Sequence, residues 1–357
     1  MATKKIKRGG SAKIARTGKA KSGRTAAPRL QTVTAAPAAT APVPAPPSAR
    51  NPWLVWALLA VVVLVGAEVF VMVKGKLQRQ GELKLVRVIG ERGGPPEATG
   101  KFWGPGNIRV DRKRDRVCMV DSSYYKVIFW NLQDGTFITE VDKKGLHAPV
   151  PPGSPVREGD FIPSNGAFDG NGNCYVLDKV HNEVTVVSAE YKVTGTWKIP
   201  APAEIAADDN QNIIYISDKA TNDLVAYSPA GKLLRRFGGD ALDSPGFMAV
   251  DSASGDIYAV DRGAKKVVVF SADGKIKRTW KLSLNPAGNP DIDLAQGKVF
   301  ISEHDNQKVW VYSPKGDLLT EAEASYPGVM GVDSAGVVYL SGAAGIHQYH
   351  LAKKKSE

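Results

Sequence analysis

A unit of roughly 40 residues recurs along most of the chain and constrains its fold more than any other feature. The clearest copy covers residues 229–274, where four short apolar segments alternate with turns rich in Gly, Pro, Asp and Ser. An acidic residue ends the first predicted strand of each copy, and in most copies another ends the second. The first set is Asp111, Asp169, Asp208, Asp251, Asp293 and Asp333, and the second is Asp121, Asp178, Asp218, Asp261 and Glu303. A four-stranded sheet cannot bury both faces alone, so the copies are expected to pack side by side.

These copies predict an all-β, six-bladed β-propeller with four-stranded blades over residues 83–351. The last copy supplies only three strands, whereas Leu83 to Ile89 resembles the fourth strand of the unit. We therefore expect this N-terminal strand to close the ring as the outermost strand of the last blade. Closure removes the open edges that the first and last blades would otherwise present to each other. Residues 77–82 would be a linker and residues 352–357 a short tail.

The residues before the repeats are of two kinds. Residues 1–50 hold basic but no acidic residues and end in an Ala/Pro-rich run, which predicts a disordered tail. Residues 51–76 contain the apolar stretch Trp53 to Val73, interrupted only by the charge of Glu68. Such a stretch is long enough, at about 1.5 Å per residue, to cross a hydrocarbon core of about 30 Å, so it predicts a transmembrane signal anchor. The basic tail predicts a cytoplasmic N terminus and a periplasmic propeller, held on the inner membrane of a bacterial envelope.

The formal net charge of +11 resides in the tail, because basic and acidic residues balance in the rest of the chain. The tail has no aromatic residues interleaved for base stacking, so nucleic-acid recognition is not expected. Attraction to anionic lipid is the expected role of its charge.

The two cysteines, Cys118 and Cys174, lie in second strands of neighbouring copies. They differ by one residue in register, so their side chains are expected on opposite faces of their sheets. We predict two buried thiols without a disulfide.

The repeated unit resembles the NHL repeat, and residues 246–275 (GFMAVDSASGDIYAVDRGAKKVVVFSADGK) are its best example. The resemblance covers the whole repeated region and implies a propeller. It implies little about function, since such propellers serve as binding platforms, sensors, lyases and lactonase-like enzymes. The usual Asn-x-Arg at the start of the third strand is absent here. The corresponding pairs are Tyr125-Lys126, Asn182-Glu183, Asn222-Asp223, Lys265-Lys266 and Gln307-Lys308.

The turns between second and third strands should emerge on one face of the ring, together with the connections between copies. The long Pro-rich connection Asp142 to Asp160 belongs to this face and either arches over it or contacts a partner. Neither a Ser-His-Asp arrangement nor a phosphate loop nor a Cys/His cluster is apparent, so we assign no catalytic residue. The expected function is a scaffold or sensor that binds an envelope protein or a glycan. The candidate binding residues are Tyr124, Tyr125, His147, His181, Arg262, His304 and Asp305.

The alternative is a metal-dependent hydrolase or lyase that uses the central channel. The resemblance implies two such enzymes, calcium-dependent lactonases and amidating lyases with histidines. A calcium ion could be bound by Asn107, Asn165, Glu204 and Asn289, near the starts of first strands. Zinc shared by His181 and His304 is disfavoured, because these residues would stand on opposite sides of the ring. The repeated acids are too numerous for one site, so their carboxylates are expected to accept hydrogen bonds within their turns.

Overall fold

The computed structural model describes residues 60–66, 68–69, 72, 75, 80–95, 98–104, 106–141, 161–283, 289–325, 327–342 and 344–353. The chain divides into two compact units, residues 1–61 and 62–357, and the second holds all the strands. The basic tail and the connection 142–160, with its His147, lie outside the described residues.

The predicted transmembrane helix is the first correction. Residues 60–66, 68–69, 72 and 75 are helical, and the residues between them lie outside the described part of the chain. Among the residues that the structure describes, no helix has both the length and the apolar composition needed to cross a bilayer. The expected location of the protein is not tested by this finding and stays a prediction.

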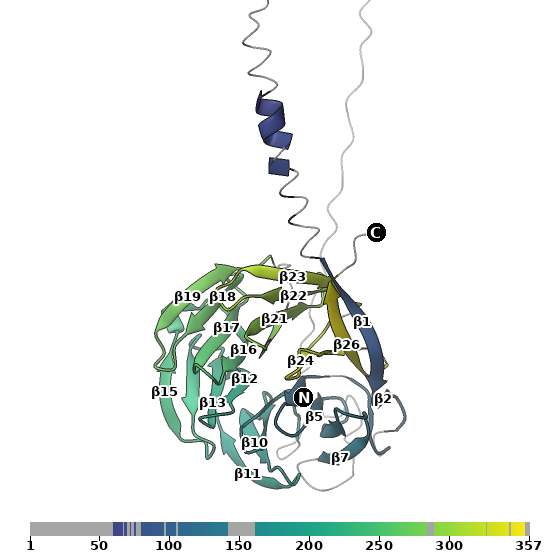
Figure 1. The fold of residues 1–357 in the computed structure, drawn as a ribbon. Helices are drawn as coiled ribbons and strands as arrows, with labels where there is room; N and C mark the ends of the chain where they lie inside the picture. The colour runs from purple at the N-terminus through teal and green to yellow at the C-terminus, as the bar shows by residue number, and fades with distance from the viewer. Residues whose placement is uncertain are drawn as a thin grey trace, which may run out of the picture. The chain divides into compact units, whose positions relative to one another are not determined.

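Four sheets of four antiparallel strands each follow the repeat, and they surround a common centre (Figure 1). In each sheet the strands are neighbours in the order of the sequence, joined by the predicted turns. The strands are β4 (Ile108–Asp111), β5 (Arg116–Asp121), β6 (Lys126–Asn131) and β7 (Phe137–Val141); β8 (Asn165–Phe168), β9 (Cys174–Asp178), β10 (Glu183–Val187) and β11 (Val193–Lys198); β12 (Pro202–Asp208), β13 (Ile213–Asp218), β14 (Leu224–Tyr227) and β15 (Leu233–Phe237); and β16 (Pro245–Asp251), β17 (Asp256–Asp261), β18 (Lys266–Phe270) and β19 (Ile276–Lys281). A short 3-10 helix, η1 (Gly239–Ala241), precedes β16.

The remaining strands do not form two further separate blades, so the prediction of a ring of six four-stranded blades is wrong. They join in one eight-stranded sheet, and a two-stranded sheet pairs β2 (Glu91–Arg92) with β3 (Lys101–Phe102). The order of the large sheet is β20 (Asp291–Ala295), β21 (Lys298–Glu303), β22 (Lys308–Tyr312), β23 (Leu318–Glu323), β1 (Gln80–Ile89), β26 (Ile346–Lys353), β25 (Val338–Ser341) and β24 (Met330–Val332).

Strand β1 is the physical reason for this difference. It pairs antiparallel with β26, as an added outer strand would, but it begins at Gln80 rather than at Leu83. The extra residues, Gln80 to Glu82, pair in parallel with Glu321 to Glu323 of β23. Strand β1 therefore pairs with the free edges of both β26 and β23. It joins into one sheet the strands that the repeat alone would place in two separate sheets. The supported fold is all-β and propeller-like.

The inner strands β4, β8, β12, β16, β20 and β24 pack each against the next, and β24 packs against β4, so they enclose a central channel. The core lies between neighbouring sheets: one cluster joins Val260 and Val267 to Val299 and Ile301, which are all fully buried. Outer strands such as β11 and β19 are largely exposed. Burial thus follows position in the sheet, and the channel is lined by the ends and inner faces of the first strands.

The repeated acids play the structural role that we predicted, with one exception. Asp169 accepts backbone N–H bonds from Asn171 and Asn173, both at 2.9 Å, and Asp208 does the same for its own turn. In the second set, Asp121 accepts from the N–H groups of its own turn and from the segment before its sheet. Asp293 differs, because its carboxylate accepts from Val332 N at 2.7 Å in another strand and pairs with an arginine.

Both cysteines are free and buried, and they lie on opposite faces of their sheets, as predicted. Cys118 and Cys174 belong to one core cluster between the first two sheets. Cys118 lies on the face of the first sheet that packs on the second, and Cys174 on the face of the second sheet that packs on the first, so opposite faces bring them together. A hydrogen bond to Cys118, together with burial, raises the pKa of the Cys174 thiol.

The buried tyrosines predict that the free energy of unfolding decreases at alkaline pH. Burial raises the pKa of Tyr312 to about 12, with a further contribution from Glu321. The same cause raises the pKa values of Tyr175, Tyr215, Tyr227, Tyr258, Tyr339 and Tyr349. An unfolded tyrosine loses its proton near pH 10 while the folded one keeps it, so the unfolded state binds fewer protons and stability falls as pH rises.

We expect the free energy of unfolding to decrease steadily above about pH 10, with Tyr312 alone contributing about 2 kcal/mol at pH 12. Urea unfolding at a series of pH values measures this slope. Tyr312→Phe should make the slope shallower, and Tyr125→Phe, in a partly exposed turn, is the matched control. Stability that is constant from pH 9 to pH 12 would contradict the prediction.

Candidate functional site

The turns after β5, β9, β13, β17, β21 and β25 define one surface, which we call the turn face. The structure places the two predicted tyrosines there in different settings. Tyr124 is buried, and its hydroxyl donates to the Gly94 carbonyl at 2.6 Å. Tyr125 is partly exposed and has a left-handed backbone with φ of 55°, a conformation shared by the equivalent Asn182, Asn222, Lys265 and Gln307. Tyr124 therefore supports the face, and Tyr125 shapes its turn.

His181 is held by a buried carboxylate. Its Nδ1 lies 2.8 Å from Oδ2 of Asp178, whose other oxygen accepts the backbone N–H groups of Val180 and His181. The imidazole is mostly buried, and the position of its Nδ1 is set by this contact. His304, by contrast, is exposed and lies beside Asp305, with 3.3 Å between Nδ1 and Oδ1.

Arg262 and Asn289 meet at the rim of the turn face. Arg262 Nη1 donates to Asn289 Oδ1 at 3.2 Å and its Nη2 donates to Ser244 Oγ at 3.4 Å. Both residues are exposed. Asn289 is thus bound to the rim and separate from the buried members of the predicted calcium set.

Of that set, the structure brings Asn165 and Glu204 together. Asn165 Nδ2 donates to Glu204 Oε2 at 2.5 Å, and Lys179 Nζ donates to Glu204 Oε1 at 2.8 Å. Asn107 is buried, and its Oδ1 has no hydrogen-bond partner among the described residues. The Lys179 ammonium supplies the positive charge that a calcium ion would bring to Glu204. Within the part of the chain that the structure describes, no three His, Cys, Asp or Glu side chains are grouped as a metal site.

An ion pair across the channel was missed from the sequence. Arg109 of β4 donates to both carboxylate oxygens of Asp291 in β20, at 3.0 and 3.3 Å, and to the Met330 carbonyl at 3.1 Å. The side chains are 13% and 1% exposed, and the guanidinium lies 5.5 Å from the Phe247 ring centroid. Burial raises the pKa of Asp291; burial alone would lower that of Arg109, but Asp291 and other carboxylates outweigh it and raise it. The sequence did hold a signal for this pair. Arg109 is charged at a position of the first strand where most other copies have a small residue.

An exposed aromatic patch lies on the turn face, formed by Trp103, Arg92 and Tyr124. Trp103 is 49% exposed, and its ring lies 5.5 Å from the Arg92 guanidinium carbon and 6.3 Å from the Tyr124 ring. Arg92 also donates through Nε to the Trp103 carbonyl at 2.8 Å, and its N–H bonds Ala344 in the turn after β25. The patch therefore bridges the first and last repeats. Sequence reasoning did not single out Trp103, although an aromatic residue directly before the first repeat was a signal.

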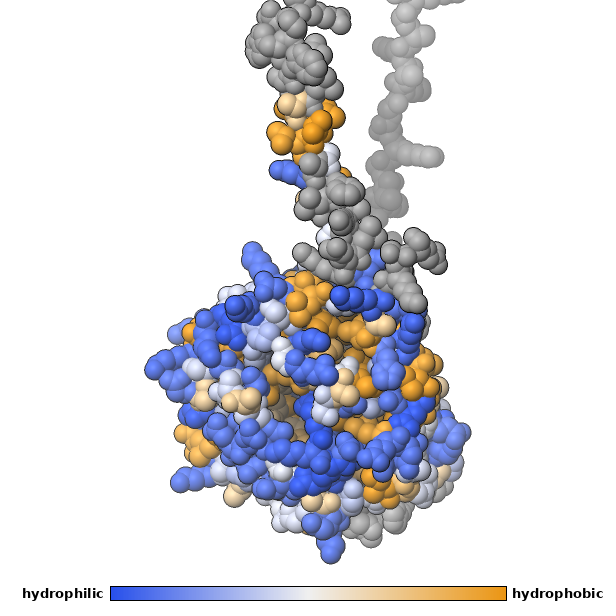
Figure 2. Space-filling view, in the orientation of Figure 1, coloured by the Kyte–Doolittle hydropathy of each residue, from blue (hydrophilic) through white to orange (hydrophobic). Residues whose placement is uncertain are grey.

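Figure 2 shows a hollow near the centre of the visible face, bordered by both hydrophilic and hydrophobic residues. No protein-family model and no curated protein matches the sequence significantly. Solved structures do match.

The fold is similar to those of lyases. A streptogramin B lyase structure aligns with a TM-score of 0.51 and 14% identity over 76% of this chain and 97% of that one. Virginiamycin B lyase from Staphylococcus aureus aligns with a TM-score of 0.52 and 14% identity over 76% and 99% of the two chains. A catalytically inactive histidine-to-alanine variant of that lyase, with quinupristin, aligns with a TM-score of 0.50 and 16% identity over 76% and 88%. At these identities the likeness establishes a propeller-like fold, and the NHL assignment stays a prediction.

Proposed function

We propose that this chain is a binding propeller that recognises a protein partner through its turn face, with Trp103 as the main contact residue. The observation that carries the proposal is the half-exposed indole of Trp103, stacked beside Arg92 and Tyr124. Trp, Arg and Tyr are the residue types that contribute most of the binding energy at protein interfaces. The patch includes one residue predicted from the sequence, since Tyr124 was a candidate of the turn face.

The patch is held rigidly before any partner arrives. The backbone N–H of Trp103 donates to Oδ2 of the buried Asp121 at 2.8 Å, and the Tyr124 hydroxyl is bonded to the Gly94 carbonyl. Lys101 and Glu91 form an ion pair at its edge. A contact surface whose side chains are already ordered loses little conformational entropy on binding. Rigidity of this kind supports a recognition role.

Trp103→Ala tests the proposal. We expect the variant to bind the partner at least about 30-fold more weakly, as truncation of a hot-spot residue costs about 2 kcal/mol or more. The full-length protein serves as bait, and affinity for each captured protein is then measured by titration. Leu233→Ala is the matched control, because Leu233 is 51% exposed on the outer strand β15.

The proposal requires a protein that wild type and Leu233→Ala bind equally and that Trp103→Ala loses. Equal binding by all three proteins would contradict the role of the patch, and capture of a polysaccharide alone would replace the protein partner with a glycan. Circular dichroism of Trp103→Ala shows whether the fold is intact, since the side chain is replaced at a half-exposed position.

A second candidate function is that of a lyase, and one contact favours it. Asp178 holds Nδ1 of His181, an arrangement in which Nε2 can act as a general base. Proteins with a similar fold are lyases, and one of them is inactive as a histidine variant. Conversion of quinupristin by the wild-type protein, lost in His181→Gln, would favour this candidate over the binding propeller.

A further inference from the structure

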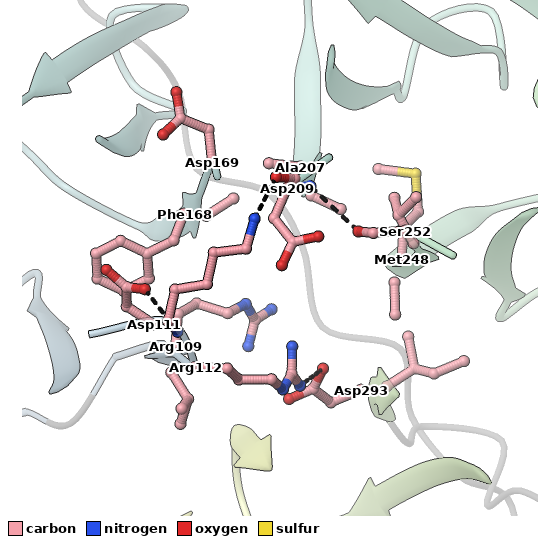
Figure 3. Close-up of a pocket in the computed structure, with 17 residues that line it drawn as sticks. Arg109, Asp111, Arg112, Phe168, Asp169, Ala207, Asp209, Met248, Ser252 and Asp293 are labelled. Atoms are coloured by element: carbon pink, nitrogen blue, oxygen red, sulfur yellow. Dashed lines mark hydrogen bonds and ion pairs between the residues drawn. The ribbon is translucent and has the colours of Figure 1, made fainter. Parts of the chain in front are cut away.

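A small cavity lies at the end of the channel opposite the turn face. It is enclosed by the C-terminal ends of the inner strands β4, β8, β12, β16 and β20 and by the residues that follow them (Figure 3). Its volume is about 80 Å³. A water molecule needs roughly 10–15 Å³ on this measure, so the cavity holds about six non-hydrogen atoms. It is thus sized for a very small molecule or for the end of a larger one.

Three cationic side chains line this cavity, and two of them are neutralised. Arg109 is paired with Asp291, and Arg112 Nη2 donates to Asp293 Oδ1 at 2.6 Å. Lys113 stands at the exposed rim, where its Nζ donates to the Asp209 backbone carbonyl at 2.8 Å. Among the described residues, no carboxylate lies within ion-pair distance of Lys113. The Lys113 ammonium therefore keeps an uncompensated charge and unused hydrogen-bond donors.

Four acidic side chains line the cavity as well, and three of them have partners. Asp111 pairs with Arg116, Asp169 accepts from the Tyr175 hydroxyl and from its own turn, and Asp293 pairs with Arg112. The Asp209 carboxylate has no hydrogen bond or ion pair with any described residue. Figure 3 shows this carboxylate directed into the cavity, while that of Asp169 points away. The cavity therefore presents one uncompensated positive and one uncompensated negative charge.

The position of the Asp209 carboxylate is set by its backbone. The Asp209 N–H donates to Ser252 Oγ at 3.2 Å, and its carbonyl accepts from Lys113. The Lys113 ammonium and the Asp209 carboxylate thus stand close to each other without forming an ion pair. A ligand that carries an anionic and a cationic group on one carbon atom can bridge them.

We infer that this cavity binds the zwitterionic head of a free α-amino acid. The ligand carboxylate would accept from Lys113, and the ligand ammonium would donate to Asp209. Glycine and alanine have five and six non-hydrogen atoms, which matches the volume, and a longer side chain can leave through the open mouth. A metal cation is opposed by Lys113 and a simple anion by Asp209, since each would meet a like charge at short range.

Isothermal titration calorimetry of the full-length protein with glycine and with L-alanine tests this inference. We expect saturable binding of both amino acids, and much weaker binding of acetate and of methylammonium, which carry one charge each. Lys113→Gln and Asp209→Asn should each weaken binding of glycine at least tenfold. The matched controls are Lys315→Gln and Asp240→Asn, exposed residues outside the cavity, which should bind as wild type does.

Several outcomes would overturn the inference. Acetate binding as tightly as glycine would make the cavity an anion site, and equal binding of methylammonium would make it a cation site. Saturable binding that survives both cavity variants would place the amino acid elsewhere. If neither amino acid binds to protein that has the wild-type melting temperature, the cavity holds only water and the inference is wrong. None of these results depends on the partner of the turn face.

Discussion

Replacing Asp291 with alanine is expected to lower the free energy of unfolding by about 3–5 kcal/mol, the range for breaking one side of a buried ion pair. The variant leaves the Arg109 guanidinium buried without its counter-charge. It also removes the acceptor for the Met330 N–H, at 2.8 Å, and for the Ile292 N–H. The pair joins β4 to β20, which are not neighbours around the channel, so the loss affects the contact between the first sheet and the large sheet.

Urea unfolding followed by circular dichroism measures this loss. Asp273→Ala is the matched control, because Asp273 forms an exposed ion pair with Lys275 and its removal should leave the transition midpoint unchanged. The double variant Arg109→Met, Asp291→Leu should recover much of the stability, since it removes both charges and keeps apolar volume. If Asp291→Ala unfolds at the same urea concentration as the control, the pair does not brace the channel.

The Arg116→Met variant is expected to lose about 3 kcal/mol, again because a buried carboxylate is left without its partner. Arg116 is 2% exposed and its Nε lies 2.9 Å from Asp111 Oδ2. Its other nitrogens donate to the Gly172 and Ala189 carbonyls of the second sheet, and the guanidinium lies 5.0 Å from the Tyr191 ring and 5.1 Å from the Phe168 ring. One side chain therefore ties the first sheet to the second.

Hydrogen exchange locates this effect. In Arg116→Met, amides of β8 and β9 should exchange faster than in wild type, while those of β16 to β19 should change less. Arg114→Met is the control, because Arg114 contacts the same Asp111 at 3.5 Å but is much more exposed. A uniform increase in exchange over the whole ring would show that Arg116 stabilises the fold globally and does not act at this one junction.

Local features of the fold could be read from the sequence because they depend on neighbouring residues. Alternation of apolar side chains and the spacing of turns predicted the strands, and the Asx turns of Asp169 and Asp208 followed from side chains that bond their own backbone. Burial of Cys118 and Cys174 followed from their place in second strands. The role of Asp293 was misjudged, because the same position in a repeat can bond a different strand.

The candidate binding residues stay predictions, and the structure shows how they are held. Tyr124, His181 and Arg262 do lie on the turn face, but they support it or bond to their neighbours. The contact residue that we propose is Trp103, whose backbone is bonded to Asp121 and to Arg92. Packing between repeats decides which aromatic side chain stays exposed. The sequence pattern within one repeat does not predict this.

The sequence by itself determined the all-β character, the repeat and the turn chemistry, since these are interactions over a few residues. Only the tertiary structure decided that β1 joins β26 and β23 in one sheet, that Arg109 meets Asp291 at a separation of 182 residues, and that Lys113 and Asp209 share a cavity. The physical reason is that closing the ring brings distant strand ends to one axis. Charged side chains and unpaired strand edges bond there to groups that lie close in space. A local sequence pattern does not specify which groups those are.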